Sequence, residues 1–361
     1  MRQRQLDGIR AIAILSVIAL HHFLFPVGWA GVDLFFVLSG FLITRILIQT
    51  RNKPGYWTKF YIKRAGRILP PLMILFPATL ALSHHIKPLG LLGYVLFLGD
   101  YVNITSYSSG LLICLWSLAI EEHFYMIWPF TVRYLTRKHM AQVLIAVLVL
   151  EPVLRVIATH FVATYEPIYY LTFFRLDSIA AGSLLAVLIA HPKANTLLKS
   201  WSLTLCLIAI ALWTILASIF GSQFDKNTNS MLFNGLGYSL VTLASFGVVA
   251  HVLVKEDGWL AKILSIRPLT FIGEISYGMY LFHPMIEATL RKLSHTGFGA
   301  ASAAGTRKLF LIALPLTIAF CWVSFKLFES PIVKWSKHKA KELGRQQIDP
   351  GLEHKSNLIL Q

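Results

Sequence analysis

The chain has 361 residues, of which 56% are hydrophobic and only 14% are charged, and its formal net charge is +16. Soluble globular proteins carry about 25% charged residues, so this composition excludes an ordinary soluble domain. The excess of Lys and Arg would indicate a nucleic-acid partner in a soluble chain. Here these residues lie between long apolar runs, and no nucleic-acid partner is expected. The cysteines are far apart and predict neither a disulfide framework nor a metal site.

Long apolar runs recur along the whole chain and predict an all-α, polytopic integral membrane protein with about ten transmembrane helices. The first run contains paired histidines and no small-residue cleavage site, so it is not interpreted as a signal peptide. A short stretch broken by glycines, 88–103, is expected to be re-entrant or interfacial. The expected spans are 9–27, 32–50, 68–85, 115–132, 140–158, 169–190, 201–220, 232–252, 270–290 and 308–328.

Most of the 33 Lys and Arg residues lie in one set of alternate connections between these spans. Cytoplasmic loops carry such an excess, so both termini are predicted to be cytoplasmic. We expect one transmembrane domain over 1–333 and a basic cytoplasmic tail over 334–361. The tail is expected to be a frayed, solvated helix against anionic head groups of the lipid bilayer.

Arg10 and His21 lie eleven residues apart in the first apolar run. Eleven residues make about three helical turns, so both side chains are expected on one face, about 16 Å apart along the axis. A cation and an imidazole are costly in lipid and should face the protein interior. His21 is therefore the candidate base of a reaction site. His22 points about 100° away and is expected to be structural or interfacial.

Asp33 lies at the start of the second expected span, just after a tight outer turn at 26–31. Because the first two spans are neighbours in sequence, Asp33 is expected to reach a histidine of the first span. A carboxylate on one ring nitrogen would fix the tautomer and leave the other nitrogen as a base. The alternative is that His21 and Asp33 only tie two helices together.

Arg64 and Arg67 are three residues apart at the inner side, so they are expected to share a helix face. Guanidinium groups bind phosphate oxygens in a bidentate fork. A cytosolic phosphorylated donor is therefore expected to bind here, with Arg10 as a third candidate. The alternative is ordinary positive charge at the inner end of a helix.

Other charged or titratable side chains also lie inside apolar runs. Glu121 and Glu122 are adjacent, and one is expected to face the core while the other pairs locally. Arg175 and Asp177 are two residues apart, so they should have separate partners, either in a polar cavity near the outer surface, where they would bind the acceptor substrate, or in structural ion pairs. His283 precedes a proline that implies a kink, and we expect it to support the site as a third substrate-binding candidate.

These features predict a histidine base toward the outside and guanidinium groups toward the inside. This arrangement suits a long phosphorylated donor that enters from the cytosol and transfers a group to a hydroxyl acceptor. The competing function is a transporter of a small anion or a lipid-linked sugar, because such proteins also carry intramembrane His, Asp and Arg. An inverted repeat would favour transport, and the sequence shows none. A purely structural membrane scaffold is a third possibility.

Six motifs, in order and with matching hydropathy, make the chain resemble the membrane acyltransferase 3 family over about residues 5–335. The motifs are LDGIR at 6–10, GVDLFFVLSGF at 31–41, KRAGRILP at 63–70, WSLAIEEHFY at 116–125, SYGMYLFHP at 276–284 and FESP at 328–331. The resemblance implies a bacterial inner-membrane O-acyltransferase that moves an acetyl group from acetyl-CoA to a hydroxyl of a carbohydrate or glycolipid, such as O-antigen, without a metal. It also implies the stand-alone form, without a C-terminal esterase-like domain.

The family's patterns also imply roles for individual residues. His21 would be the base or would carry the acyl group covalently, and Asp33, Glu121 or Glu122 would orient it. The family often has Gln where this chain has His123. The matching pairs are Arg10 and His21 for the Arg-then-ten-then-His pattern, Arg64 and Arg67 for the Arg-x-x-Arg pattern of the acyl-CoA donor, and Glu121 and Glu122 for the paired glutamates.

Overall fold

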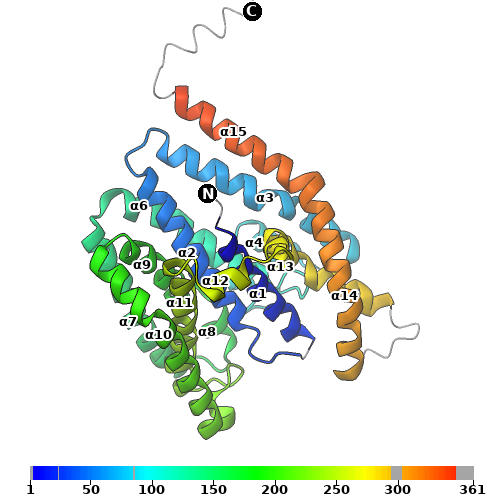
Figure 1. The fold of residues 1–361 in the computed structure, drawn as a ribbon. Coiled ribbons are helices and arrows are strands. Elements are labelled where there is room, and N and C mark those ends of the chain that lie inside the picture. Colours follow the sequence, from blue (N-terminus) through cyan, green and yellow to red (C-terminus); the bar gives the residue numbers. More distant parts are fainter. Residues whose placement is uncertain (1–2, 23, 84–85, 294–302, 347–361) are drawn as a thin grey trace, which may run out of the picture.

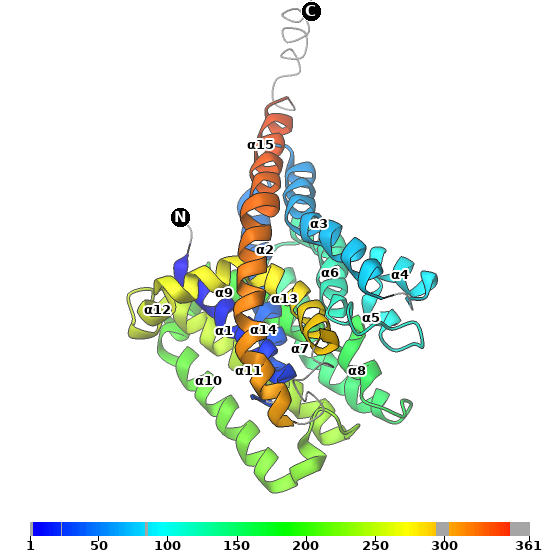
Figure 2. The same ribbon diagram turned by 90° about the vertical axis from the view of Figure 1, so that its right-hand side faces the viewer.

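The computed structural model describes residues 3–22, 24–83, 86–293 and 303–346. Within these ranges it contains helices and no strand, which confirms the all-α fold class. The helices form a bundle from which α3 and α15 extend together at one end (Figures 1 and 2). The α-helices are α1 (Arg4–His21), α2 (Ala30–Thr50), α3 (Tyr56–Leu82), α4 (Pro88–Val95), α5 (Gly99–Val102), α6 (Leu115–Tyr134), α7 (Arg137–Thr159), α8 (Glu166–Tyr170), α9 (Leu176–Ile189), α10 (Pro192–Phe220), α11 (Tyr238–Val254), α12 (Trp259–Leu264), α13 (Arg267–Leu293), α14 (Ala303–Ser324) and α15 (Ser330–Gln346).

Short segments of other helix types join some of these elements. Two are 3-10 helices, η1 (Thr172–Phe174) and η2 (Gly221–Phe224). Two are π-helices, η3 (Phe233–Gly237) before α11 and η5 (Phe325–Glu329) between α14 and α15. The π-helices continue the direction of their neighbours, so α14, η5 and α15 form one long helix.

In the described part of the chain, six helices are long and apolar enough to cross a membrane. They support a multi-pass membrane protein, but the predicted count of about ten spans is not confirmed. The expected spans at 9–27, 115–132 and 270–290 do form α1, α6 and α13, yet these helices carry several charged residues. The six are Ala30–Thr50, Tyr56–Leu82, Arg137–Thr159, Pro192–Phe224, Phe233–Val254 and Leu309–Leu343.

The stretch 88–103 forms two short helices, α4 with eight residues and α5 with four. A full crossing needs about 20 residues, so neither helix spans a bilayer. Phe97 between them adopts a positive φ of 57°, which turns the chain sharply. This agrees with the expectation that the stretch is not a crossing.

Helix α2 lies at the centre of the bundle and packs closely against α9. A Cβ atom on Gly182 would lie 1.9 Å from the carbonyl oxygen of Val37, and one on Gly40 would lie 2.0 Å from that of Ile179. Glycines of this kind let two helix backbones approach closely inside a membrane. The contact holds α9, and with it Arg175 just before its start, against the first half of α2.

Helix α1 packs along α13 through a second close approach. A Cβ atom on Gly273 would lie 1.8 Å from the carbonyl oxygen of Asp7. This contact fixes the parts of the two helices around Asp7 and Gly273 relative to each other. Because both helices then run in the same direction, His21 at the end of α1 comes to lie beside His283 of α13.

Helix α15 packs along α3, which differs from the solvated helix that the basic composition of the tail predicted. Ser336 and Ala340 are 1% and 0% exposed, and a Cβ atom on Gly66 would lie 2.3 Å from the hydroxyl of Ser336. Small residues one turn apart thus form an interface that composition alone does not reveal. The boundary at 333 stays a prediction, and residues 347–361 lie outside the described residues.

Candidate active site

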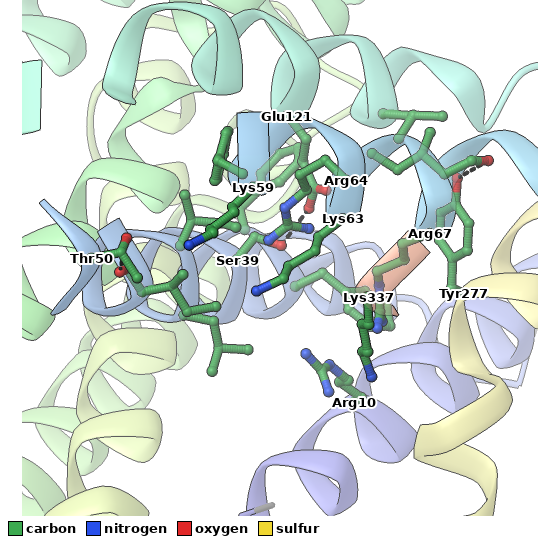
Figure 3. A pocket seen from close by; sticks show the side chains of 18 of the residues that line it. Arg10, Ser39, Thr50, Lys59, Lys63, Arg64, Arg67, Glu121, Tyr277 and Lys337 are labelled. Carbon is green, nitrogen blue, oxygen red and sulfur yellow. Dashed lines mark hydrogen bonds between the residues drawn. The ribbon is translucent and has the colours of Figure 1, made fainter. Parts of the chain in front are cut away.

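A pocket of about 430 Å³ runs along α2 between α3, α6 and α13. The α2 residues that line it extend from Val32 to Thr50, which is about 27 Å of helix. Phe35 and Phe36 line it close to Val32, and cationic side chains from α1, α3 and α15 line it as well. The cationic residues in the lining are Arg10, Lys53, Lys59, Lys63, Arg64, Arg67 and Lys337, as Figure 3 shows for most of them.

Arg10, Arg64 and Arg67, the three predicted donor-binding residues, all line this pocket. Arg10 donates from Nη1 to Asp7 Oδ1 at 2.9 Å, one turn earlier on α1. The Arg64 guanidinium lies over the Tyr125 ring, 4.6 Å from its centroid. Arg64 and Arg67 both belong to α3, which begins at Tyr56 rather than at residue 68 as expected. The structure therefore brings three guanidinium groups from two helices into one space.

Glu121 lines the same pocket, whereas Glu122 does not. The Glu121 carboxylate accepts hydrogen bonds from the hydroxyls of Ser39 at 2.6 Å and Tyr125 at 2.9 Å. Among the described residues, Glu122 Oε1 is buried and has no hydrogen-bond partner. Glu121 therefore belongs to the pocket and links α2 to α6, while Glu122 lies on another face of α6.

The deep end of the pocket lies close to the predicted base. Ser117 and Tyr280 line it, and their hydroxyls are 2.7 Å apart. The Tyr280 ring lies 6.2 Å from that of His283, one turn further along α13. His21 and His283 do not themselves line the pocket, so Tyr280 and Ser117 separate it from the two histidines.

His21 and His283 lie together, with ring centroids 5.1 Å apart. Nδ1 of His283 donates to the carbonyl oxygens of Met279 at 3.1 Å and Tyr280 at 3.0 Å. This fixes the proton on Nδ1 and leaves Nε2 as an acceptor. His283 is 3% exposed, and its Nε2 has no hydrogen-bond partner in the described structure. His21, in contrast, is exposed, which differs from the expectation that it faces the protein interior. It contacts the interior on the side that faces the His283 ring.

His22 lies on a different side of α1, as expected from its position. It is buried against α13 and α14, with Nε2 at 3.8 Å from Glu287 and its ring 5.3 Å from that of Phe310. These contacts support the prediction that His22 is structural, since they connect the end of α1 to α13 and α14.

Asp33 does not make the expected hydrogen bond to a histidine of the first helix. Its carboxylate accepts from Arg175 Nη2 at 2.8 and 2.9 Å and from the hydroxyl of Ser178 at 2.7 Å. Both charged groups are fully buried. An isolated carboxylate inside the bundle would be very costly, and the guanidinium from α9 neutralises it. The sequence places Arg175 142 residues away, so local spacing did not reveal this pair.

Arg175 and Asp177 have separate partners, as their spacing predicted. The Asp177 carboxylate accepts from Arg155 Nη1 of α7 at 2.8 Å. Arg155 is itself fully buried and donates to the carbonyl oxygen of Asn234 at 2.7 Å. No role was predicted for Arg155 from the sequence. Its signal was an isolated arginine in an apolar run, which marks a buried functional or structural pair.

Comparison with known proteins identifies the chain. Residues 3–326 match the model of an acyltransferase domain, the acyltransferase 3 family. The chain belongs to the acyltransferase 3 family. This confirms the resemblance drawn from the six motifs. No solved structure matches the chain.

Acyltransferase 3 relatives include the peptidoglycan O-acetyltransferase OatA of Listeria monocytogenes, which is 31% identical and covers 91% of this chain. The O-acetyltransferase OatA of Staphylococcus aureus strain NCTC 8325 is 28% identical over the same share. A putative O-acetyltransferase of S. aureus strain COL is 29% identical. The chain spans 55–57% of the length of these relatives.

The residues predicted from the acyltransferase 3 motifs lie in two places in the structure rather than in one. The guanidinium groups and Glu121 lie in the basic pocket, and His21 and His283 lie beyond its deep end. Within the described residues, no group of three or more His, Cys, Asp or Glu side chains is arranged to hold a metal ion. The sequence analysis missed Tyr280, Ser117 and Lys337 as pocket residues. Uncharged hydroxyls and a tail lysine carry no sequence signal of a pocket.

Proposed function

We propose that this chain is an O-acyltransferase of a bacterial inner (cytoplasmic) membrane that transfers an acetyl group from acetyl-CoA to a hydroxyl of a cell-envelope carbohydrate or glycolipid. The observation that carries the proposal is the pocket along α2, which seven cationic side chains line and which reaches Tyr280, whose ring lies 6.2 Å from that of His283. The names of the relatives, which are O-acetyltransferases, support the acetyl group, and one of them names peptidoglycan.

The shape and charge of the pocket suit a coenzyme A thioester. Such a donor has several phosphates at one end and an uncharged pantetheine arm at the other. Arg10, Arg64 and Arg67 would bind phosphate oxygens, since guanidinium groups match phosphate geometry. The arm would follow the apolar wall of α2 toward Tyr280, about one helical turn from His283.

In the proposed reaction, His21 takes the proton of the acceptor hydroxyl as its oxygen attacks the thioester carbonyl. The new carbon–oxygen bond forms, the carbon–sulfur bond breaks, and the proton passes to the departing thiolate. The products are an O-acetyl ester and free coenzyme A. The exposure of His21 at the outer end of α1 suits an acceptor that arrives from outside. Acyl transfer through a covalent acyl-histidine remains the alternative route.

His283 is proposed to bind the acceptor or the transferred proton through its free Nε2. Glu121 is proposed to hold the pocket wall in place through Ser39 and Tyr125. Arg175, which was expected to bind the acceptor, has a buried carboxylate partner. We therefore propose that the Arg175–Asp33 pair positions α9 against α2 and does not bind the acceptor. Asp177 is likewise paired, with Arg155, and is also proposed to act in positioning.

Two measurements together test this function. Envelope carbohydrates from cells with and without the gene are compared by mass spectrometry, and the gene is expected to add acetyl groups. Labelled acetyl-CoA is supplied to membrane vesicles, and the label is expected on the carbohydrate. Uptake of a small anion or of a lipid-linked sugar without any acetyl transfer would instead support the transporter.

A further inference from the structure

We propose that Lys337 of α15 binds a phosphate group of the acyl donor, so that the C-terminal helix completes the donor site. This inference rests on the proposed function for the identity of the donor. Helix α15 begins at Ser330, beyond residues 3–326 that match the family domain. Lys337 nevertheless lines the same pocket as Arg10, Arg64 and Arg67.

The position of Lys337 is set by close packing of α15 on α3. Ser336, the residue before it, is 1% exposed and lies against Gly66, where a Cβ atom would be 2.3 Å from the Ser336 hydroxyl. Gly66 is in turn the residue before Arg67. The two helices therefore touch next to both cations, and Lys337 and Arg67 both line the pocket. Figures 1 and 2 show α15 running alongside α3.

Lys337 lies among other cations that line the same pocket. In Figure 3, the side chains of Lys337, Arg67 and Arg10 converge on the pocket from α15, α3 and α1. Lys63 of α3 lines this pocket as well. In the described part of the chain no carboxylate pairs with Lys337, whereas Lys339 lies 3.6 Å from Glu342. Gathered cations repel one another at short range, and a phosphate between them would remove this cost.

The phosphate chemistry has two possible sources, the donor and the head groups of the bilayer. The donor is favoured because Lys337 lines the pocket, whereas a lysine for head groups would face outward like its neighbour Lys334, which does not line it. A lysine binds phosphate as a point charge. It therefore suits a monophosphate or the outer oxygens of a diphosphate, next to the bidentate arginines.

The test measures binding of coenzyme A and acetyl transfer with the full chain in nanodiscs of neutral lipid. Lys337→Ala is expected to weaken coenzyme A binding and raise the KM for acetyl-CoA by about tenfold, as for the loss of one charge-assisted hydrogen bond. Its kcat is expected to stay within about twofold of wild type. Lys334→Ala, on the same helix but outside the pocket, is the matched control and should change neither value.

Acetyl-pantetheine, which lacks the nucleotide and its phosphates, provides the second comparison. Wild type and Lys337→Ala should use it equally well if Lys337 acts on a donor phosphate. If Lys337→Ala instead lost as much activity with acetyl-pantetheine as with acetyl-CoA, the substitution would disturb the fold. That result would overturn the proposal. So would unchanged coenzyme A binding, or an effect seen only in bilayers with anionic lipid, which would assign Lys337 to head groups.

The binding measurement separates this inference from the proposed function. If wild type binds coenzyme A more tightly than Lys337→Ala but transfers no acetyl group, the proposed function fails and the phosphate site stands. If acetyl transfer occurs and Lys337→Ala matches wild type, the function stands and the inference fails. If wild type binds no coenzyme A, both fail.

Discussion

The centroids of the imidazole rings of His21 and His283 lie 5.1 Å apart, on two helices that touch closely at Asp7 and Gly273. The partner ring is fixed, because Nδ1 of His283 is held by two backbone carbonyl oxygens. Its free Nε2 is therefore a buried acceptor beside the candidate base. The sequence predicted His21 as a single base, whereas the structure shows a pair of histidines, of which His21 is exposed and His283 is buried.

Two substitutions of His283 distinguish the roles of its two ring nitrogens. His283→Asn keeps a donor near the position of Nδ1 and removes Nε2, so the helix contacts should survive while acetyl transfer falls by about 100-fold, within the range of a lost acid–base group. His283→Gln keeps a polar atom near Nε2 and should retain more activity. Equal activity of His283→Asn and wild type in a vesicle transfer assay would show that Nε2 has no part in the reaction.

Removing one member of the Asp33–Arg175 pair should mainly affect stability. Asp33→Ala leaves a buried guanidinium without its carboxylate and is expected to cost about 3–5 kcal/mol. Thermal unfolding in detergent measures this loss. The double variant Asp33→Leu with Arg175→Met removes both charges and should recover much of it. If Asp33→Ala is as stable as wild type but inactive, Asp33 acts in the reaction itself rather than by positioning.

The close contact of α2 and α9 predicts a strong steric effect. A methyl group on Gly182 would meet the carbonyl oxygen of Val37 at 1.9 Å, so Gly182→Ala must separate the two helices. Overpacking of this kind costs about 1–3 kcal/mol or more, and the yield of folded protein should fall. Gly110→Ala is the matched control, because nothing lies within 4 Å of its Cβ position. Similar melting temperatures for the two variants would contradict the packing described.

The arginines of the basic pocket should control donor affinity. Arg67→Lys keeps the charge but loses the bidentate fork, so the KM for acetyl-CoA is expected to rise about tenfold while kcat changes little. Arg133→Lys, on α6 and outside the pocket lining, serves as a control for general effects of such a change. A fall in kcat with unchanged KM would place Arg67 in the chemical step instead of in donor binding.

The sequence predicted much of this site because several of its signals are local. The eleven-residue interval between Arg10 and His21, and the three-residue interval between Arg64 and Arg67, depend only on helix geometry. Apolar runs located the helices for the same reason. The charged residues within α1, α6 and α13 are also what made a count of spans from hydropathy unreliable.

Contacts between residues far apart in the chain could not be predicted from the sequence. Asp33 was expected to contact a histidine at the end of α1, which is close in sequence. Its buried partner is instead Arg175, 142 residues further along the chain. The packing of α15 on α3 depends on small residues, Gly66, Ser336 and Ala340, whose only signal is their size. Such contacts are properties of the assembled bundle, and they decide which charges reach the pocket.

The most direct measurement of the central claim is acetyl transfer by the purified protein in nanodiscs, with labelled acetyl-CoA and an envelope carbohydrate, for wild type, His21→Ala and His22→Ala. The account predicts that His21→Ala loses at least about 100-fold in kcat while still binding coenzyme A, and that His22→Ala, which only packs between helices, keeps most of the activity of its folded fraction. Acetyl transfer by His21→Ala at the wild-type rate would contradict the account.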